Sequence, residues 1–355
     1  MRAFLLRLAC AALLGLATPW AWAATVSVQP GQDLQAAITA AAPGDVVEVQ
    51  RGHYRTNLLI DKPLTLRGLG RPTVDGGLQG DTIRVTAPAV VIEGLIVRDS
   101  GSSLKDQNAG IYLYPGAHRA VVRNNDLTYN LFGLWIEKAN DVLIENNLIT
   151  GKRDLNSAQR GNGIQLYNTQ RAQILNNNIS FVRDALYVDV SHHAIFRGNK
   201  LHHSRYGTHY MTSYYNLWEN NDTYYNRGGL ALMEVRDQTV RNNRAWGNSD
   251  HGIMLRSVQD AVVEGNVVAG NNRGFFIYDV EYATLKNNLV VDNVVGVHLS
   301  AGRCVMWAHA TSPGVWRAAT TGATTWAGTA TTTAWVTCVT KPTTWWTASA
   351  GATRA

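Results

Sequence analysis

A four-residue motif, glycine followed by an apolar, a variable and a second apolar residue, recurs nine times from Gly110 onwards, with looser copies at Ala185 and Gly207. The copies follow one another with a period of about 22 residues, apart from one longer step between Gly133 and Gly163. Helical repeats are longer than this, and the alternation of apolar and polar residues is typical of short strands. The period therefore predicts an all-β, right-handed parallel β-helix of the pectin-lyase-like type, with one core over residues 24–302.

A second feature with the same period is a column of asparagines. We expect these residues to form a stacked amide ladder in a turn, a structural role rather than a catalytic one. We expect the glycine of each motif to supply the backbone angles of a tight corner. The predicted ladder consists of Asn125, Asn147, Asn177, Asn199, Asn221, Asn243, Asn266 and Asn288.

The two ends of the chain differ from the repeat. Residues 1–23 have a basic start, an apolar stretch and small residues at Ala21 and Ala23, which predicts a signal peptide cleaved after Ala23 and export to the periplasm. Leu34–Ala41 is amphipathic and is expected to be a helical cap on the first rung. The mature chain has no other apolar segment long enough to span a membrane.

The tail, residues 303–355, has an unusual composition. It holds 15 Thr, 12 Ala and six of the eleven Trp, but no Leu, Ile, Phe, Asn, Asp or Glu. In a shifted reading frame, Thr, Ala, Gly and Trp codons become codons for ordinary turn, acidic and apolar residues. We therefore interpret residues 303–355 as a frameshifted, disordered tail, and expect the strand at 297–299 to be left as an open sheet edge. The alternative interpretation is a low-complexity Thr/Ala linker.

Charge and cysteine content exclude two classes of function. The whole chain has a formal charge of +6, but its excess of basic residues lies outside residues 24–302, which contain 26 basic and 26 acidic residues. A neutral body lacks the electrostatic attraction needed to bind nucleic acid. The body also has no cysteine, which excludes disulfides and cysteine-based zinc sites.

The second and fourth residues after each glycine should point outward and form columns along the stack. In this register Met211 lies over Met233, and His209 and Met254 flank the small Ala231, with His251 at the neighbouring corner. Thioethers and imidazoles favour Cu(I) over harder cations, so these five residues are a candidate copper site. The alternative is that the methionines cover a groove against a partner or loop. The pairs His192/His193 and His202/His203 are either secondary ligands or simply exposed polar residues.

A carbohydrate function is the alternative of a different class. Outward aromatic residues on the first rungs could stack on sugar rings: Tyr112, Tyr114, Trp135, Tyr167 and Tyr187. An enzyme would need paired acids on this face, and the outward columns offer Glu137 and Asp189, two rungs or about 10 Å apart. We assign no catalytic residue, and keep a polysaccharide-binding or polysaccharide-modifying β-helix as the second interpretation.

Non-repeat residues carry a family resemblance. Tyr54–Gly70, Gly207–Asn221, Gly229–Met233 and Asn248–Arg256 resemble NosD, the periplasmic β-helix family of nitrous oxide reductase maturation. The resemblance implies a role in supplying copper to the reductase, with an ABC-type permease and ATPase and a copper chaperone as partners. The frame-corrected tail also resembles the NosD C-terminal region. The printed tail departs from the family, which implies loss of docking to the permease.

The interpretation of the tail can be tested by sequencing the gene. We expect a one- or two-base slip close to codon 303, after which a shifted frame encodes an acidic, leucine-containing segment. An intact gene whose only open frame yields residues 303–355 would contradict this expectation.

Overall fold

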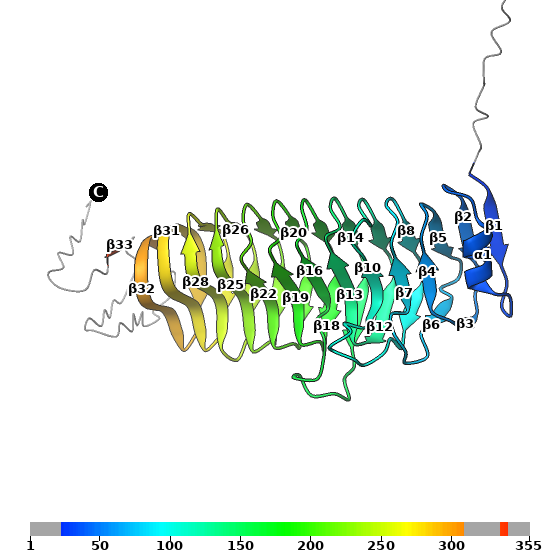
Figure 1. The fold of residues 1–355 in the computed structure, drawn as a ribbon. Coiled ribbons are helices and arrows are strands. Elements are labelled where there is room, and N and C mark those ends of the chain that lie inside the picture. The colour runs from blue at the N-terminus through cyan, green and yellow to red at the C-terminus, as the bar shows by residue number, and fades with distance from the viewer. Residues whose placement is uncertain (1–22, 309–333, 340–355) are drawn as a thin grey trace, which may run out of the picture.

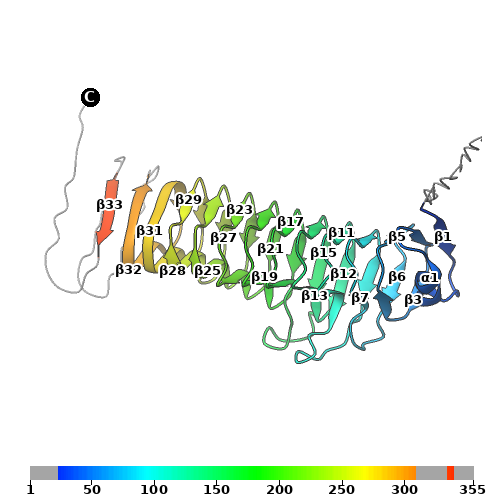
Figure 2. The same ribbon diagram turned by 45° about the horizontal axis from the view of Figure 1, so that its top comes forward.

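The chain forms one elongated parallel β-helix, as the repeat predicts (Figures 1 and 2). The structure is a computed structural model and describes residues 23–308 and 334–339. The predicted signal peptide, apart from its last residue, and residues 309–333 and 340–355 of the tail lie outside this range. Among the residues described, no helix has the length and apolar character needed to span a bilayer.

Three stacks of parallel strands make up the walls of the solenoid, and each rung contributes one strand to each stack. The first stack contains β1 (Thr25–Val28), β2 (Val46–Val49), β5 (Thr65–Gly68), β8 (Val91–Glu93), β11 (Val121–Arg123), β14 (Leu143–Glu145), β17 (Gln173–Leu175), β20 (Ile195–Arg197), β23 (Leu217–Glu219), β26 (Thr239–Arg241) and β29 (Val262–Glu264). The second contains β3 (His53–Arg55), β6 (Thr73–Asp75), β9 (Ile96–Arg98), β12 (Asp126–Asn130), β15 (Leu148–Gly151), β18 (Asn178–Ser180), β21 (Lys200–His202), β24 (Asp222–Tyr224), β27 (Arg244–Trp246) and β30 (Val267–Ala269). The third contains β4 (Leu58–Ile60), β7 (Ile83–Val85), β10 (Ala109–Leu113), β13 (Phe132–Glu137), β16 (Ile164–Tyr167), β19 (Asp184–Asp189), β22 (Tyr206–Met211), β25 (Gly228–Arg236), β28 (His251–Gln259) and β32 (Val295–Ala308). Strand β31 (Arg273–Val291) runs without a break around one rung and pairs with strands of all three stacks.

The core is a column of apolar side chains that runs the length of the solenoid. Alternate residues of each short strand point inward, and equivalent inward residues of successive rungs lie on one another. The rings of Phe196 and Trp218, one rung apart, stack with their centroids 3.9 Å apart. Tyr210 is also fully buried, and its hydroxyl donates to Oε1 of Gln238 at 2.9 Å. Larger aromatic residues therefore fill the core in the rungs that precede β25.

The motif glycines have a role different from the one predicted. Gly133, Gly163 and Gly229 do not have a positive φ, so the prediction that they supply unusual corner angles is wrong. They are needed for close approach, because a Cβ on Gly133 would lie 2.5 Å from the carbonyl oxygen of Gly163. A Cβ on Gly229 would lie 2.2 Å from the carbonyl oxygen of Gly252. Glycine recurs here because the backbones of successive rungs nearly touch.

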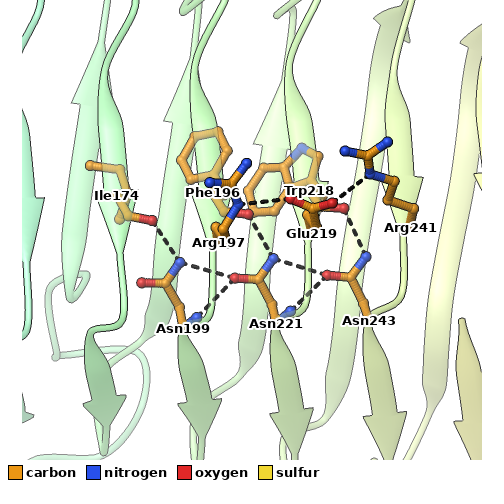
Figure 3. Close-up of polar contacts among 9 residues, drawn as sticks. All are labelled: Ile174, Phe196, Arg197, Asn199, Trp218, Glu219, Asn221, Arg241 and Asn243. Atoms are coloured by element: carbon orange, nitrogen blue, oxygen red, sulfur yellow. Dashed lines mark hydrogen bonds and ion pairs between the residues drawn. The ribbon is translucent and has the colours of Figure 1, made fainter.

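The eight asparagines of the predicted ladder lie in one buried column between the first and second stacks. Figure 3 shows three of them. Nδ2 of Asn221 donates to the carbonyl of Phe196 and to Oδ1 of Asn243, both at 2.9 Å. Oδ1 of Asn221 in turn accepts from the backbone N–H and from Nδ2 of Asn199, at 3.0 and 2.9 Å. The amide of Asn221 thus satisfies polar groups of the preceding rung and bonds to the amide of the following one.

The residue before each ladder asparagine has a left-handed backbone. Asn124, Asn146, Asn220 and Asn242 have φ values of 55–57°, and Gly198 occupies the equivalent position with φ 69°. Asparagine and glycine tolerate this conformation better than other residues. The recurrent Asn-Asn and Gly-Asn pairs therefore encode one bent corner per rung, the first residue making the bend and the second entering the ladder.

A helix covers the N-terminal end of the solenoid (Figures 1 and 2). Helix α1 (Leu34–Ala40) contacts β1, β2 and β4 and buries Leu34 and Ile38. The side chain of Asp33 accepts from the N–H of Ala36 at 3.0 Å and so caps the helix. The helix begins at Leu34, as the amphipathic pattern predicts, and ends at Ala40, one residue before the predicted end.

The C-terminal end extends beyond the predicted boundary at residue 302. Strand β32 continues to Ala308, and part of the tail predicted to be disordered forms β33 (Ala334–Val339). Strand β33 pairs antiparallel with residues 303–308 of β32, so it does not continue the parallel stacking of the rungs. Within the described residues, the segment 297–299 pairs with β31 on one side, and β33 does not reach it.

We predict that Asn221→Ala lowers the free energy of unfolding by about 2–4 kcal/mol, because it leaves the buried carbonyl of Phe196 and the backbone N–H of Asn199 without their partner. Urea denaturation followed by circular dichroism measures this. The matched control is Asn272→Ala, at an exposed asparagine of a nearby turn, which should change stability by less than about 0.5 kcal/mol. Equal destabilisation by the two substitutions would contradict a structural role for the ladder.

Candidate functional site

The residues of the predicted copper site lie on the third stack, on β22, β25 and β28. The register pairs Met211 with Met233, and it pairs His209 with Ala231 and Ala231 with Met254. Met211 and Met233 are half-buried, whereas Met254 is only 7% exposed. The register brings the two thioethers of Met211 and Met233 onto adjacent rungs and leaves His209 and Met254 separated by one small residue.

His251 is the most unusual member of this group. It is 1% exposed, and neither of its ring nitrogens has a hydrogen-bond partner in the described part of the chain. The closest carboxylate oxygen, Oδ2 of Asp250, is 3.7 Å from Nδ1. A buried imidazole with no partner is costly, so a role for its nitrogens outside the chain's own hydrogen bonding is expected.

A glycine makes room for this imidazole. A Cβ on Gly228 would lie 2.5 Å from Nε2 of His251 and 2.6 Å from the ring of Tyr206. The rings of Tyr206 and His251 come from strands on either side of β25, yet their centroids are 5.7 Å apart. The middle rung thus has two small residues on this face, Gly228 and Ala231. Side chains of the two flanking rungs can therefore approach each other across it.

His209 is held by a buried ion pair that the sequence analysis missed. Asp184 is fully buried, and its Oδ2 lies 3.1 Å from Nδ1 of His209, while Nε of Arg205 donates to its Oδ1 at 2.8 Å. Burial alone would raise the pKa of Asp184, but the hydrogen bonds and charges of His209 and Arg205 outweigh it and hold the pKa below its usual value. Arg183 and Arg205 lie one repeat apart in the sequence, and this recurrence was the available signal that charged residues gather at this corner.

The other sequence-predicted ligands do not join the group. The ring of His192 stacks on Tyr214, and its Nδ1 accepts from the N–H of Tyr214 at 3.0 Å. Nδ1 of His202 lies 2.7 Å from Nδ1 of His203, and the ring of His202 stacks on Tyr224. His192 lies in the turn between β19 and β20, and His202 and His203 lie at the end of β21, away from the corner that carries His251. Over residues 23–308 and 334–339, no three His, Cys, Asp or Glu side chains lie close enough together to hold a metal ion.

A groove of about 640 Å³ lies on the same face, over β13, β16, β19 and β22. Its floor carries the outward residues Trp135, Glu137, Gln165, Tyr187 and Asp189, and His209 lies in its lining. Tyr112, one of the predicted outward aromatic residues, is only 4% exposed, and it belongs to a buried cluster against which Leu155 packs. Its hydroxyl donates to Oε2 of Glu137 at 2.6 Å, and burial followed by this hydrogen bond raises the pKa of Tyr112.

Comparison with known proteins supports one family. Residues 145–305 match the family described as "Periplasmic copper-binding protein (NosD)". A protein of Pseudomonas aeruginosa named "Probable ABC transporter binding protein NosD" is 36% identical over 133 residues, 38% of this chain and 31% of its own length. Over these residues the chain is similar to NosD-type proteins. A protein of Stutzerimonas stutzeri with the same name is 31% identical over 133 residues, 38% of this chain and 30% of its own length. The chain thus aligns with about a third of the length of these relatives.

Several solved structures have a similar fold. The A-module of the mannuronan C-5 epimerase AlgE4 from Azotobacter vinelandii has a TM-score of 0.51 at 18% identity, over 75% of this chain and 76% of that one. DFA-IIIase from Arthrobacter chlorophenolicus has a TM-score of 0.53 at 16% identity, over 80% and 84% of the two chains. Identities this low establish the parallel β-helix fold and no activity.

We predict that Asp184→Asn destabilises the protein by about 3 kcal/mol near neutral pH, because it leaves Arg205 partly buried without its counter-charge. The folded-state pKa of Asp184 lies below its usual value, so its contribution to stability is present above about pH 4 and is lost as the pH falls through the folded-state value. The gap in melting temperature between wild type and variant should narrow on acidification. Asp61→Asn, at an exposed carboxylate, is the control and should leave the profile unchanged. A gap that stays constant from pH 7 to about pH 3 would contradict the assignment.

Proposed function

We propose that this chain is an exported accessory protein that carries copper as cargo in the periplasm, after cleavage following Ala23. In this proposal it passes Cu(I) towards the copper sites of nitrous oxide reductase during their assembly. The observation that carries the proposal is the buried, unpartnered imidazole of His251 on the face where the methionines Met211, Met233 and Met254 occupy three successive rungs.

The donor set fits Cu(I) better than other ions. Thioethers and neutral imidazoles are soft ligands that bind Cu(I) and compete poorly for Mg²⁺ or Ca²⁺. Met211, Met233 and Met254 are the only methionines in residues 24–302, and all three lie on β22, β25 and β28. Their exposure decreases from half-buried at Met211 and Met233 to buried at Met254, as a surface that receives an ion from outside would require.

The contacts of His209 also support a ligand role. Metal-binding histidines commonly donate one ring N–H to a carboxylate, which orients the ring and leaves the other nitrogen free to bind. The 3.1 Å contact of Nδ1 with Oδ2 of Asp184 has this form, and Arg205 donates to both oxygens of the same carboxylate. In this arrangement Nε2 of His209 carries the lone pair available to copper.

The proposed partners follow from the relatives. Their names describe binding to an ABC transporter, so we propose that this chain works with an ABC-type permease and ATPase. A copper chaperone that delivers the ion and the reductase that receives it complete the proposed route. In this proposal the chain only carries copper and makes or breaks no bond in a substrate, so we propose no catalytic residue.

The tail belongs to the same proposal. We propose that residues 303–355 replace a C-terminal region through a frameshift, and that docking to the permease is lost with it. The methionine-bearing rungs are separated from residue 303 by β31 and the start of β32, and a solenoid keeps local structure when distant rungs change. Copper binding should therefore survive in the printed chain even where partner docking does not.

We predict that the purified protein binds Cu(I) in competition with a coloured Cu(I) chelator. Replacing His209, Met211 and Met233 together by Ala should weaken binding by about 100-fold or more, because three soft ligands are removed. His298→Ala is the matched control, since His298 lies in the column of His209 and Met254 but two rungs beyond the methionines. It should change affinity by less than about two-fold. Equal affinity of the triple variant and wild type would leave only a packing role for the methionines.

A further inference from the structure

We propose that the groove over β13, β16, β19 and β22 binds a linear, uncharged oligosaccharide. The groove reaches β22, the first of the methionine-bearing rungs, where His209 lies in its lining, but the lining includes no methionine. The inference is independent of copper binding and rests on the shape of the groove, on its aromatic floor and on its polar groups.

The groove is built by two insertions into an otherwise regular repeat. Ile83 pairs with Ile111, and Leu134 pairs with Ile164. In both pairs the two residues are farther apart in the sequence than any two residues that pair between neighbouring rungs from β16 to β31. Both insertions leave the same corner, between the second and third stacks, and project from the solenoid in Figures 1 and 2. The groove is lined by Leu104 and Gln107 of the first loop and by Arg160 of the second.

The two loops are held in place by specific contacts. Nζ of Lys152 donates to the carbonyl of Ser100 at 3.1 Å and to the hydroxyl of Ser102 at 2.7 Å, which ties the base of the second loop to the first. Arg160 folds back on its own loop and donates to the carbonyl of Leu155 at 2.7 Å. Two loops fixed in this way form a preformed side of the groove. Because they are already ordered, less conformational entropy is lost when a ligand binds.

The floor offers flat aromatic surfaces at rung intervals. Trp135 and Tyr187 are half-buried and Tyr167 is 39% exposed, and the three come from β13, β19 and β16. The C–H faces of a pyranose ring pack on such surfaces. Successive rungs are about 4.8 Å apart, close to the length of one sugar unit in a linear polymer. A chain of sugars running along the solenoid axis would therefore meet a new rung at each unit.

The polar groups of the groove favour a sugar without net charge. Three arginines, Arg160, Arg183 and Arg205, are matched by three carboxylates, Glu137, Asp184 and Asp189. A site for a polyanion would have an excess of cations. Glu137, Arg183 and Asp189 are half-buried and provide acceptors and donors for neighbouring hydroxyls.

A peptide fits this surface less well. Extended peptides usually bind by adding a strand to an open sheet edge, and helical ones by burying an apolar face in an apolar groove. The floor here consists of strands whose backbone groups are already paired on both sides, for example β16 between β13 and β19. The side chains that project from it are largely polar. The groove therefore offers a peptide neither of these two modes.

The test is a glycan array followed by calorimetry on the purified protein. We expect binding to linear neutral glycans on the array, and competition by a soluble hexasaccharide of the same type. Tyr167→Ala should weaken binding about three- to ten-fold, the effect of losing one stacked ring. Tyr278→Ala is the matched control, because Tyr278 is 42% exposed on the same face but lies on β31, outside the groove. It should change affinity by less than about two-fold.

A second variant tests the polar groups without removing a ring. Glu137→Gln keeps an acceptor for the hydroxyl of Tyr112, so the groove should remain folded while binding weakens. Three results would overturn the proposal: no neutral linear glycan bound on the array, equal weakening by Tyr278→Ala and Tyr167→Ala, or a hexapeptide library that binds at the groove where hexasaccharides do not. Each of these outcomes leaves the copper assay unaffected.

Discussion

The buried amide ladder couples every rung from Asn125 to Asn288 to its neighbours, since each side chain both donates to and accepts from the adjacent corner. A corner that shifted along the axis would break bonds on both sides, so the ladder holds the rungs in register. Registered rungs turn positions one repeat apart in the sequence into neighbours about 4.8 Å apart in space. The proposed copper-binding surface and the groove are both consequences of this conversion, because each is assembled from single residues of successive rungs.

The regular part of the fold could be predicted because a period is visible without any knowledge of contacts. The register of Met211 with Met233, and of His209 with Ala231 and Met254, follows from counting residues after each glycine. The reason for the glycines could not be obtained in this way. A sequence pattern does not distinguish a residue that needs unusual backbone angles from one that lacks space for a Cβ, and the structure shows the second cause.

The parts that sequence reasoning missed are irregular in the repeat. Asp184 occupies a corner position where the next rungs carry Tyr206 and then Gly228, so no residue type recurs there. Its importance comes from burial and from Arg205, which lies on the next rung, one place out of register. The burial of Tyr112 likewise depends on an inserted loop that the period does not describe. Contacts between an insertion and the repeat must be seen in three dimensions.

The two proposed sites meet at β22. His209 lies in the groove lining, while the next outward residue of the same strand, Met211, begins the thioether column. The buried pair of Asp184 and Arg205 anchors this boundary from the groove side, and the hydroxyl of Tyr187 lies 3.9 Å from Sδ of Met211. A solenoid allows such a change of chemistry between adjacent rungs, because each rung contacts only its neighbours and the core needs only the inward residues. Substitutions on β16 should therefore act on the groove alone and substitutions on β25 on the methionine column alone. Because His209 belongs to both proposed sites, we expect a ligand bound at one site to change the affinity of the other through this residue.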